Sequence, residues 1–258
     1  TCIYSEIEAF EAQSQVFAQA AHEAMTNPEQ AQSDEVRLSW EATIDIWQRL
    51  ELMQLGPAGR KTHPGGRDLR ASIYSWPHRD HCEIDRNLTT EIYGTTPNDV
   101  SKEAKGLWAA EYLLFATGTT NACEPDDAIN MDGSWATLDE SVLALRRANY
   151  AALTANTVAD TAAILLEAWS PTVGDFLGEL TQAGEGSRTY GKKRVAINAV
   201  SDALGYLEWG IKDNKLARPL GIIGCGKPDC SDYLEATHSR RSKEHLRNNM
   251  IGFRKLFK

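Results

Sequence analysis

Apolar residues recur along most of the chain at intervals of three and four, the spacing that places them on one face of an α-helix. A first helix is predicted to end at Asn27-Pro28. A second begins after Ser33-Asp34, which supplies a helix cap, and stops at Gly56-Pro57. The apolar faces of these two helices are formed by Ile3, Ile7, Phe10, Phe17 and Ala21, and by Val36, Trp40, Ile44 and Trp47.

The same spacing continues to the end of the chain, and no stretch alternates with period two over a useful length. Residues 54–80 are rich in Gly, Pro and basic residues and predict a long loop, a feature that is usually functional or mobile. We therefore predict an all-α protein of two packed helical-bundle halves, residues 1–125, including the loop, and 126–258. The further predicted helices span 82–93, 101–116, 137–168, 172–182, 190–211 and 240–257.

Composition narrows the classes of partner. The chain has 258 residues, of which 42% are hydrophobic, enough to bury a full core. Its 27 Lys and Arg residues are outnumbered by 36 Asp and Glu residues, giving a net charge of −9. Such a charge repels phosphate backbones, so we expect no nucleic-acid partner. No window approaches the roughly eighteen apolar residues of a spanning helix, so no transmembrane segment is expected.

The five cysteines bear on the compartment. Cys225 and Cys230 lie in a Gly/Pro loop at a spacing that suits a short disulfide, and Cys82 and Cys123 lie in two other loop-like stretches. Neither a C-x₂-C spacing nor a paired His-x₃-His accompanies them, so we favour disulfides over a metal site. Disulfides indicate an oxidising, extracytoplasmic compartment. Cys2 is left over, and its place near the start suits a lipid anchor.

Glu111 is the residue most suggestive of a site. The segment from Gly106 to Phe115 is apolar around its whole circumference except for this carboxylate, and a helix of that kind is buried. A buried carboxylate needs a cation, a metal or hydrogen-bond donors, so Glu111 serves either a ligand or a structural ion pair. Glu51 poses the same question on the face that carries Trp47, although a glutamate near a helix end can also turn to solvent.

Two further clusters have a functional and a structural interpretation. His78 and His81 are neighbours on a first helical turn, or belong to a polar loop. Asp213 and Lys215 follow the 190–211 helix and form either a solvated corner or a cleft wall. The chain contains no nucleophile elbow, P-loop, dinucleotide fingerprint or zincin motif, so the common hydrolase and nucleotide-binding classes have no support.

These residues resemble the imelysin-like family of bacterial periplasmic and lipid-anchored proteins. The family motif, Gly-x-His-x-x-Glu before an apolar run, resembles Gly106 to Phe115. The match extends over most of the chain. Similar positions in the first half are Trp40, Trp47, Glu51, Gly56-Pro57-Ala58 and Ser75-Trp76-Pro77, and in the second half Ser201 to Leu204, Lys212-Asp213, Lys215 to Ala217, Pro219 to Gly221, Glu235, Ser239, Ser242, Leu246, Asn249, Gly252 and Phe253 to Phe257.

The resemblance implies two helical halves with a site at their junction, and either a role in iron uptake or metal-dependent peptidase activity. One departure matters, because Trp108 stands where the motif has histidine. An indole has one donor and no acceptor, so it cannot replace a metal-binding imidazole. We therefore expect a non-catalytic binding or accessory protein in the uptake of iron or another metal, located in the periplasm or anchored as a lipoprotein.

Two alternatives stay open. The first is a metal-dependent peptidase whose ligands include His78 or His81 together with Glu111 and Glu51, with iron or zinc as the metal. The second is a docking protein for another envelope protein, which would show an exposed apolar patch. The residues expected to line a cleft between the halves are Glu111, Trp108, Gly106, Glu51, Ser75, Trp76, Asp213 and Lys215.

Overall fold

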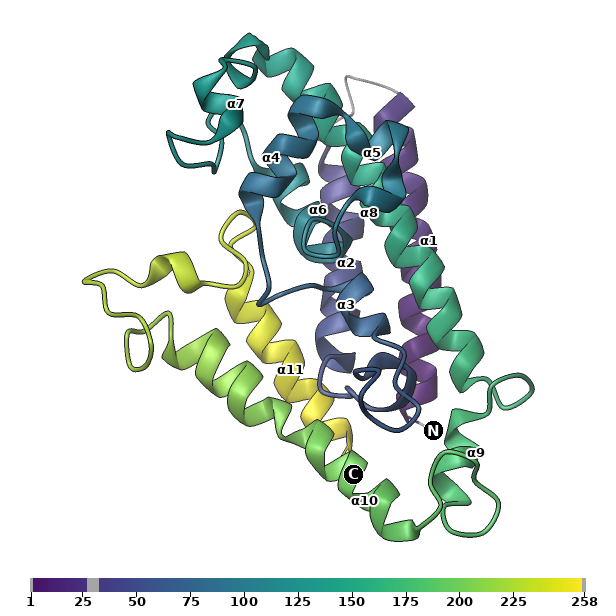
Figure 1. Cartoon of the computed structure of the whole chain (residues 1–258). Coiled ribbons are helices and arrows are strands. Elements are labelled where there is room, and N and C mark those ends of the chain that lie inside the picture. The colour runs from purple at the N-terminus through teal and green to yellow at the C-terminus, as the bar shows by residue number, and fades with distance from the viewer. Residues whose placement is uncertain (1, 27–32, 257–258) are drawn as a thin grey trace. The chain divides into compact units, whose positions relative to one another are not determined.

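The computed structural model describes residues 2–26 and 33–256, which form helices and turns and no β-strand (Figure 1). The predicted all-α class is confirmed. The side chain of Cys2, the expected lipid-anchor position, lies outside the described part. The elements are α1 (Cys2–Thr26), α2 (Asp34–Leu50), η2 (Gly56–Ala58), α3 (Leu69–Ile73), α4 (His81–Thr90), α5 (Ile92–Thr95), η3 (Pro97–Asp99), α6 (Gly106–Phe115), α7 (Ala128–Met131), η4 (Trp135–Thr137), α8 (Glu140–Trp169), α9 (Phe176–Thr181), α10 (Lys193–Leu204), η5 (Leu207–Ala217), η6 (Ser231–Tyr233) and α11 (Ser242–Leu256).

The chain forms two compact units, each assembled from several segments. Unit 1 contains Thr1–Ala12, Ile44–Arg70 and Thr161–Lys258, and unit 2 contains Gln13–Thr43 and Ala71–Asp160. Helices α1, α2 and α8 contribute residues to both units. The predicted boundary between residues 125 and 126 instead divides the chain at one point, and it stays a prediction.

Helix boundaries follow local chemistry. Helix α1 ends at Thr26, as predicted, and α2 begins at Asp34, where the Ser33 hydroxyl accepts a hydrogen bond from the backbone N–H of Val36. Helix α6 begins at Gly106 instead of residue 101. The backbone of Lys105 is extended and Gly106 has a φ of 78°, a conformation that an α-helix cannot continue through.

The predicted helix 190–211 is two elements. Helix α10 ends at Leu204, and after a turn at Gly205 the chain continues as a π-helix, η5, up to Ala217. A π-helix has hydrogen bonds from residue i to i+5 and is wider than an α-helix. The apolar pattern does not distinguish the two, so the prediction ended six residues too early.

The core of unit 1 includes a cluster over η5. Leu52, Tyr206 and Ile211 are buried, and Leu246 and Phe253 of α11 pack against them. Helix α11 and η5 lie side by side (Figure 1). Helix α11 also approaches α2 closely at Gly252, where a Cβ would lie 2.1 Å from the Arg49 carbonyl oxygen. Glycine at this position therefore permits the two backbones to meet.

Unit 2 is organised around α6. The Trp40 indole N–H donates to the Leu107 carbonyl oxygen at 2.9 Å, and the Trp40 ring meets Phe115 edge-on. The Tyr150 hydroxyl donates to the carbonyl oxygen of Ala104, just before α6, at 2.8 Å. These bonds satisfy polar atoms that would be costly to bury alone.

Both predicted disulfides are confirmed. Cys82 is joined to Cys123 in unit 2, with a Cα–Cα distance of 4.5 Å, and Cys225 to Cys230 in unit 1, with a distance of 5.9 Å. Among the described residues, no helix has the length and apolar character needed to cross a membrane.

Replacing Gly252 with alanine tests the close approach of α11 to α2. The new methyl group would overlap the Arg49 carbonyl oxygen, so Gly252→Ala should destabilise the protein by about 2 kcal/mol and lower Tm by about 4 to 8 °C in calorimetry. Gly191→Ala is the matched control, because a Cβ there meets no atom within 4 Å. Equal Tm values for the two variants would contradict the interpretation.

Candidate functional site

The start of α6 is held by a strand-like segment of the loop before α4. Tyr74 and Gly106 form an isolated antiparallel bridge. A Cβ on Gly106 would lie 2.6 Å from the carbonyl oxygen of Ile73 and 2.9 Å from that of Ser72. Glycine is therefore required at position 106 for two reasons: its φ is positive, and the backbone of Ser72 and Ile73 passes too close for a side chain. It sets the position of the next two turns of α6.

Those turns carry Trp108 and Glu111, and both side chains are buried, at 2% and 3% exposure. Their burial confirms the prediction for α6. His81, the first residue of α4, stacks on Trp108 and Tyr112 with ring centroids 4.3 and 4.4 Å apart. Trp108, Glu111 and Tyr112 are three and four residues apart and share one face of α6. An imidazole thus lies beside the face that holds the motif glutamate.

The other predicted site residues of unit 2 differ in their burial. Trp76 is buried and precedes a cis proline, Pro77. The Ser75 hydroxyl is buried, and it has no hydrogen-bond partner among the described residues. His78 is exposed, whereas Asp80 caps α4 by accepting a hydrogen bond from the Glu83 N–H at 2.8 Å. The polar cluster before α4 is thus in part a helix cap.

Asp85 is a buried carboxylate that the sequence analysis missed. Both its oxygens accept from the Tyr112 hydroxyl at 3.0 Å, and one also accepts from the Ala122 N–H at 2.7 Å. Burial raises its pKa to about 6, although these hydrogen bonds and the nearby Arg147 favour the charged form. The Cys82–Cys123 disulfide lies on the same two segments. Asp85 therefore fixes the loop that follows α6 against α4.

Unit 1 contains a buried charged cluster, which we define as Glu51, Arg70, Lys215, Glu235 and His245. The Lys215 ammonium lies 2.5 Å from Glu51 and 2.8 Å from Glu235, and Arg70 donates to Glu51 at 2.9 Å. His245 Nδ1 lies 3.3 Å from Glu235. Around these charges the polar side chains of Gln48, Asn249 and Tyr206 complete the network with further hydrogen bonds to Lys215 and Glu51.

The charges in this cluster stabilise one another. Burial alone raises the pKa of Glu235, but Lys215 and His245 lower it below its usual value. Burial and the Glu51 carboxylate together raise the pKa of Tyr206 well above 10.0, so this phenol stays protonated and donates to Glu51 at 2.5 Å. Glu51 therefore lies in the core just beyond α2 and does not turn to solvent.

The π-helix explains how Tyr206 and Lys215 both reach Glu51. An α-helix has 3.6 residues per turn, so nine residues make two and a half turns and end on the opposite face. In a π-helix, about 4.4 residues make a turn, so nine residues come back to nearly the same face. Asp213, two residues before Lys215, is half-buried and lies 3.4 Å from Lys212.

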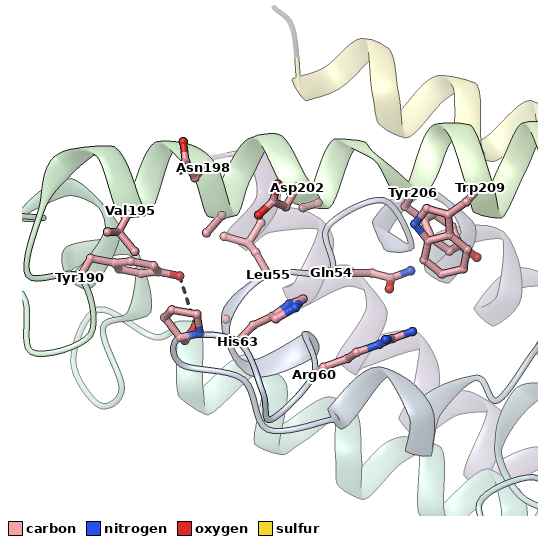
Figure 2. A pocket seen from close by; sticks show the side chains of 14 residues that line it. Gln54, Leu55, Arg60, His63, Tyr190, Val195, Asn198, Asp202, Tyr206 and Trp209 are labelled. Atoms are coloured by element: carbon pink, nitrogen blue, oxygen red, sulfur yellow. Dashed lines mark hydrogen bonds between the residues drawn. The ribbon is translucent and has the colours of Figure 1, made fainter.

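A cavity of about 300 Å³ lies in unit 1 against Tyr206 (Figure 2). Its walls come from the loop after α2, from Tyr190, and from α10 and the start of η5. The ring of Trp209 meets Tyr206 edge-on at 4.7 Å and is 40% exposed, so it forms part of the rim. The lining residues are Gln54, Leu55, Gly56, Arg60, His63, Pro64, Tyr190, Val195, Asn198, Ala199, Asp202, Ala203, Tyr206 and Trp209.

Groups of side chains that could bind one metal ion together are rare within residues 2–26 and 33–256. The only three His, Cys, Asp or Glu side chains there that lie close enough to share an ion are Cys82, Cys123 and Asp127, and the two cysteines are joined in a disulfide. On α6, the Glu111 carboxylate is a side chain that can bind iron or zinc as a ligand, whereas the Trp108 indole is not. The ligand set of Glu111, His78 and His81 stays a prediction.

The predicted cleft residues belong to two units. Gly106, Trp108, Glu111, Ser75 and Trp76 are in unit 2, whereas Glu51, Asp213 and Lys215 are in unit 1. The sequence analysis missed the cavity residues, although two signals pointed to them. The long 54–80 loop carries Arg60 and His63, and the aromatic pair Tyr206 and Trp209 lies near the end of the predicted helix 190–211.

Removing the charge of Glu51 should destabilise unit 1 strongly. Glu51→Gln leaves Lys215 and Arg70 with less compensation in a buried site, so we expect a loss of roughly 3 kcal/mol and a Tm lower by about 6 to 12 °C. Glu6→Gln is the matched control, since Glu6 pairs with Arg49 and Lys255 near the surface and should cost about 1 kcal/mol. A Tm loss no larger than the control's would show that the cluster contributes little.

Asp85 should make stability depend on pH. Its pKa is about 6 in the folded protein against 3.8 for a free group, so between about pH 4 and 6 the folded state retains a proton that the unfolded chain releases. Stability therefore falls as pH rises through this window. Relative to Asp85→Asn, the wild-type protein should lose roughly 2.4 kcal/mol between pH 4 and 7 in urea unfolding.

The control for this pH series is Asp126→Asn, which changes an exposed carboxylate of the same unit. Its difference from wild type should stay nearly constant over the range. The pKa assignment fails if the Asp85→Asn difference is equally constant.

No curated protein matches the sequence. Among solved structures, the crystal structure of a protein provisionally named iron-regulated protein A precursor, from Parabacteroides distasonis, matches with a TM-score of 0.68 and 15% identity over 96% of this chain and 68% of the other. At that identity the likeness shows the fold. The sequence profile of the family described as imelysin matches residues 4–258, and the chain therefore belongs to the imelysin family.

Proposed function

We propose that this protein is a non-catalytic binding protein of the bacterial cell envelope that takes part in the uptake of iron or another metal. The observation that carries the proposal is the motif position occupied by Trp108. Its indole is buried against the His81 ring and has no lone pair with which to bind a metal or accept a proton. The histidine on which the family motif depends is therefore not supplied at its own position.

Two further observations support the proposal. The structural neighbour is described as an iron-regulated protein, and its fold is shared over 96% of this chain. The two disulfides suit an oxidising compartment such as the periplasm. In this function Glu111 binds the metal, or a ligand that carries it, and its carboxylate is one of the donors that iron accepts.

A metal-dependent peptidase is the second candidate, and one observation favours it. The His81 imidazole lies against Trp108 and Tyr112, on the face of α6 that Glu111 shares. His81, at the start of α4, would then supply the imidazole that the motif lacks because Trp108 replaces its histidine. The two functions differ in whether bound metal activates water for peptide hydrolysis, so one set of variants tests both.

The test measures metal binding and casein hydrolysis on the same protein. Elemental analysis after incubation with ferrous, ferric or zinc ions should find bound metal in the wild type. Glu111→Gln should weaken binding roughly tenfold or more, while Tm changes by less than about 2 °C. We expect no casein hydrolysis with any of these ions. Glu103→Gln, an exposed glutamate of unit 2, is the matched control and should bind metal normally.

Each half of the proposal can fail separately. Metal-dependent hydrolysis that Glu111→Gln and His81→Asn both abolish would replace the binding function with the peptidase. Absence of bound metal under every condition would remove the metal from the proposal. A fall in Tm of several degrees in Glu111→Gln would assign the carboxylate to a structural ion pair.

A further inference from the structure

We propose that the cavity of unit 1 binds a small aromatic carboxylate that also carries a hydrogen-bond donor, such as a hydroxyl group, away from its acid group. This inference is independent of the proposed metal function, because every lining residue lies in unit 1 and Glu111 lies in unit 2. The cavity has a volume of about 300 Å³, at the small end of the range for ligand pockets, and this volume suits a single-ring molecule.

The cavity has opposite charges on facing walls. Arg60 and His63 enter from the loop after α2, and the Asp202 carboxylate enters from α10, whereas Asn198 points away (Figure 2). No ion pair or side-chain hydrogen bond joins Arg60, His63 or Asp202 to another residue in the described part of the chain. Arg60 is a permanent cation and binds carboxylates well, and Asp202 can accept from a ligand hydroxyl.

The space between these walls is aromatic and apolar. Tyr206 and Trp209 lie at one end and Tyr190 at the other (Figure 2). Aromatic rings prefer tilted or offset contacts with one another, and such pairs contribute beyond the area that they bury. Gln54 provides a hydrogen-bond donor for a ligand, because its Nε2 is buried on the cavity wall without an acceptor among the described residues. A ligand oxygen would supply that acceptor.

The wall that carries Arg60 and His63 is rigid before any ligand binds. The loop is closed by hydrogen bonds from the His63 N–H to the Arg60 carbonyl oxygen at 2.9 Å and from the Gly66 N–H to the His63 carbonyl oxygen at 3.0 Å. At Gly66 a Cβ would lie 1.8 Å from the Arg60 oxygen, so the turn needs glycine. The Tyr190 hydroxyl also donates to Pro64. Preorganisation of this kind reduces the ordering cost of binding.

The opposite end is fixed by the charged cluster. The Tyr206 hydroxyl donates to Glu51 at 2.5 Å and accepts from Arg70 at 3.1 Å, so the ring that faces the cavity is held from behind. A Cβ on Gly210 would lie 2.4 Å from this ring, so the ring packs directly against the backbone of η5 at this glycine. The aromatic wall is therefore part of the core of unit 1.

Isothermal titration with three probes tests each element of the ligand. The purified full chain is titrated with 4-hydroxyphenylacetate, with phenylacetate, which lacks the hydroxyl donor, and with 4-hydroxyphenylacetamide, which lacks the charge. We expect 4-hydroxyphenylacetate to bind, the amide to bind roughly tenfold or more weakly, and phenylacetate to fall between them.

Variants then place the binding in this cavity. Arg60→Gln should weaken the binding of 4-hydroxyphenylacetate roughly tenfold, and Asp202→Ala, which removes the acceptor, should abolish the advantage of this probe over phenylacetate. Arg67→Gln is the matched control, an exposed arginine of the same loop outside the cavity lining, and should leave binding unchanged. The proposal is overturned by no binding of any probe, by equal binding of acid and amide, or by an effect of Arg60→Gln that Arg67→Gln reproduces.

Discussion

Unit 1 depends on the burial of charges that only a π-helix can bring together. Lys215 in η5 and Tyr206, the residue just before η5, both reach Glu51, and the wider turn of the π-helix between them brings Lys215 back to the side of Tyr206. Charges so deeply buried are tolerated only when their partners are all present, so the segment cannot relax to an α-helix without exposing or isolating Lys215. Local π geometry at functional sites is common, and here it serves the wall of a cavity.

The motif helix of unit 2 is held by a different constraint, the passage of one backbone over another. The carbonyl oxygens of Ser72 and Ile73 lie so close to Gly106 that any side chain at this position would collide with them. This contact fixes the direction of α6 and so the positions of Trp108 and Glu111, whether or not the motif histidine is present. The backbone contact at Gly106 therefore positions an aromatic stack, in which the Trp108 indole lies against the His81 ring.

The sequence was sufficient where a feature depends on local spacing. The all-apolar circumference of residues 106–115 predicted the burial of Glu111, and the loop positions of four cysteines predicted both disulfides. It was insufficient where distant segments meet. Nothing in the spacing of Glu51 indicates that Arg70 and Lys215 enclose it. The apolar period also does not separate an α-helix from the π-helix η5, so Lys215 was predicted to follow the helix, at a solvated corner or a cleft wall, whereas it lies within η5 and is buried.

The cavity and the charged cluster are connected through a single side chain, and this determines what kind of ligand the cavity suits. Tyr206 shows its ring to the cavity and its hydroxyl to Glu51, so the ring brings no free polar atom to a ligand. The polar contacts must then come from Arg60, His63, Asp202 and Gln54, which are distributed around an apolar middle. A bare metal ion would find one carboxylate and one imidazole there, beside an arginine that repels it. A flat organic acid satisfies the same groups without an unpaired charge, because its carboxylate meets the cation and its ring meets the aromatic wall.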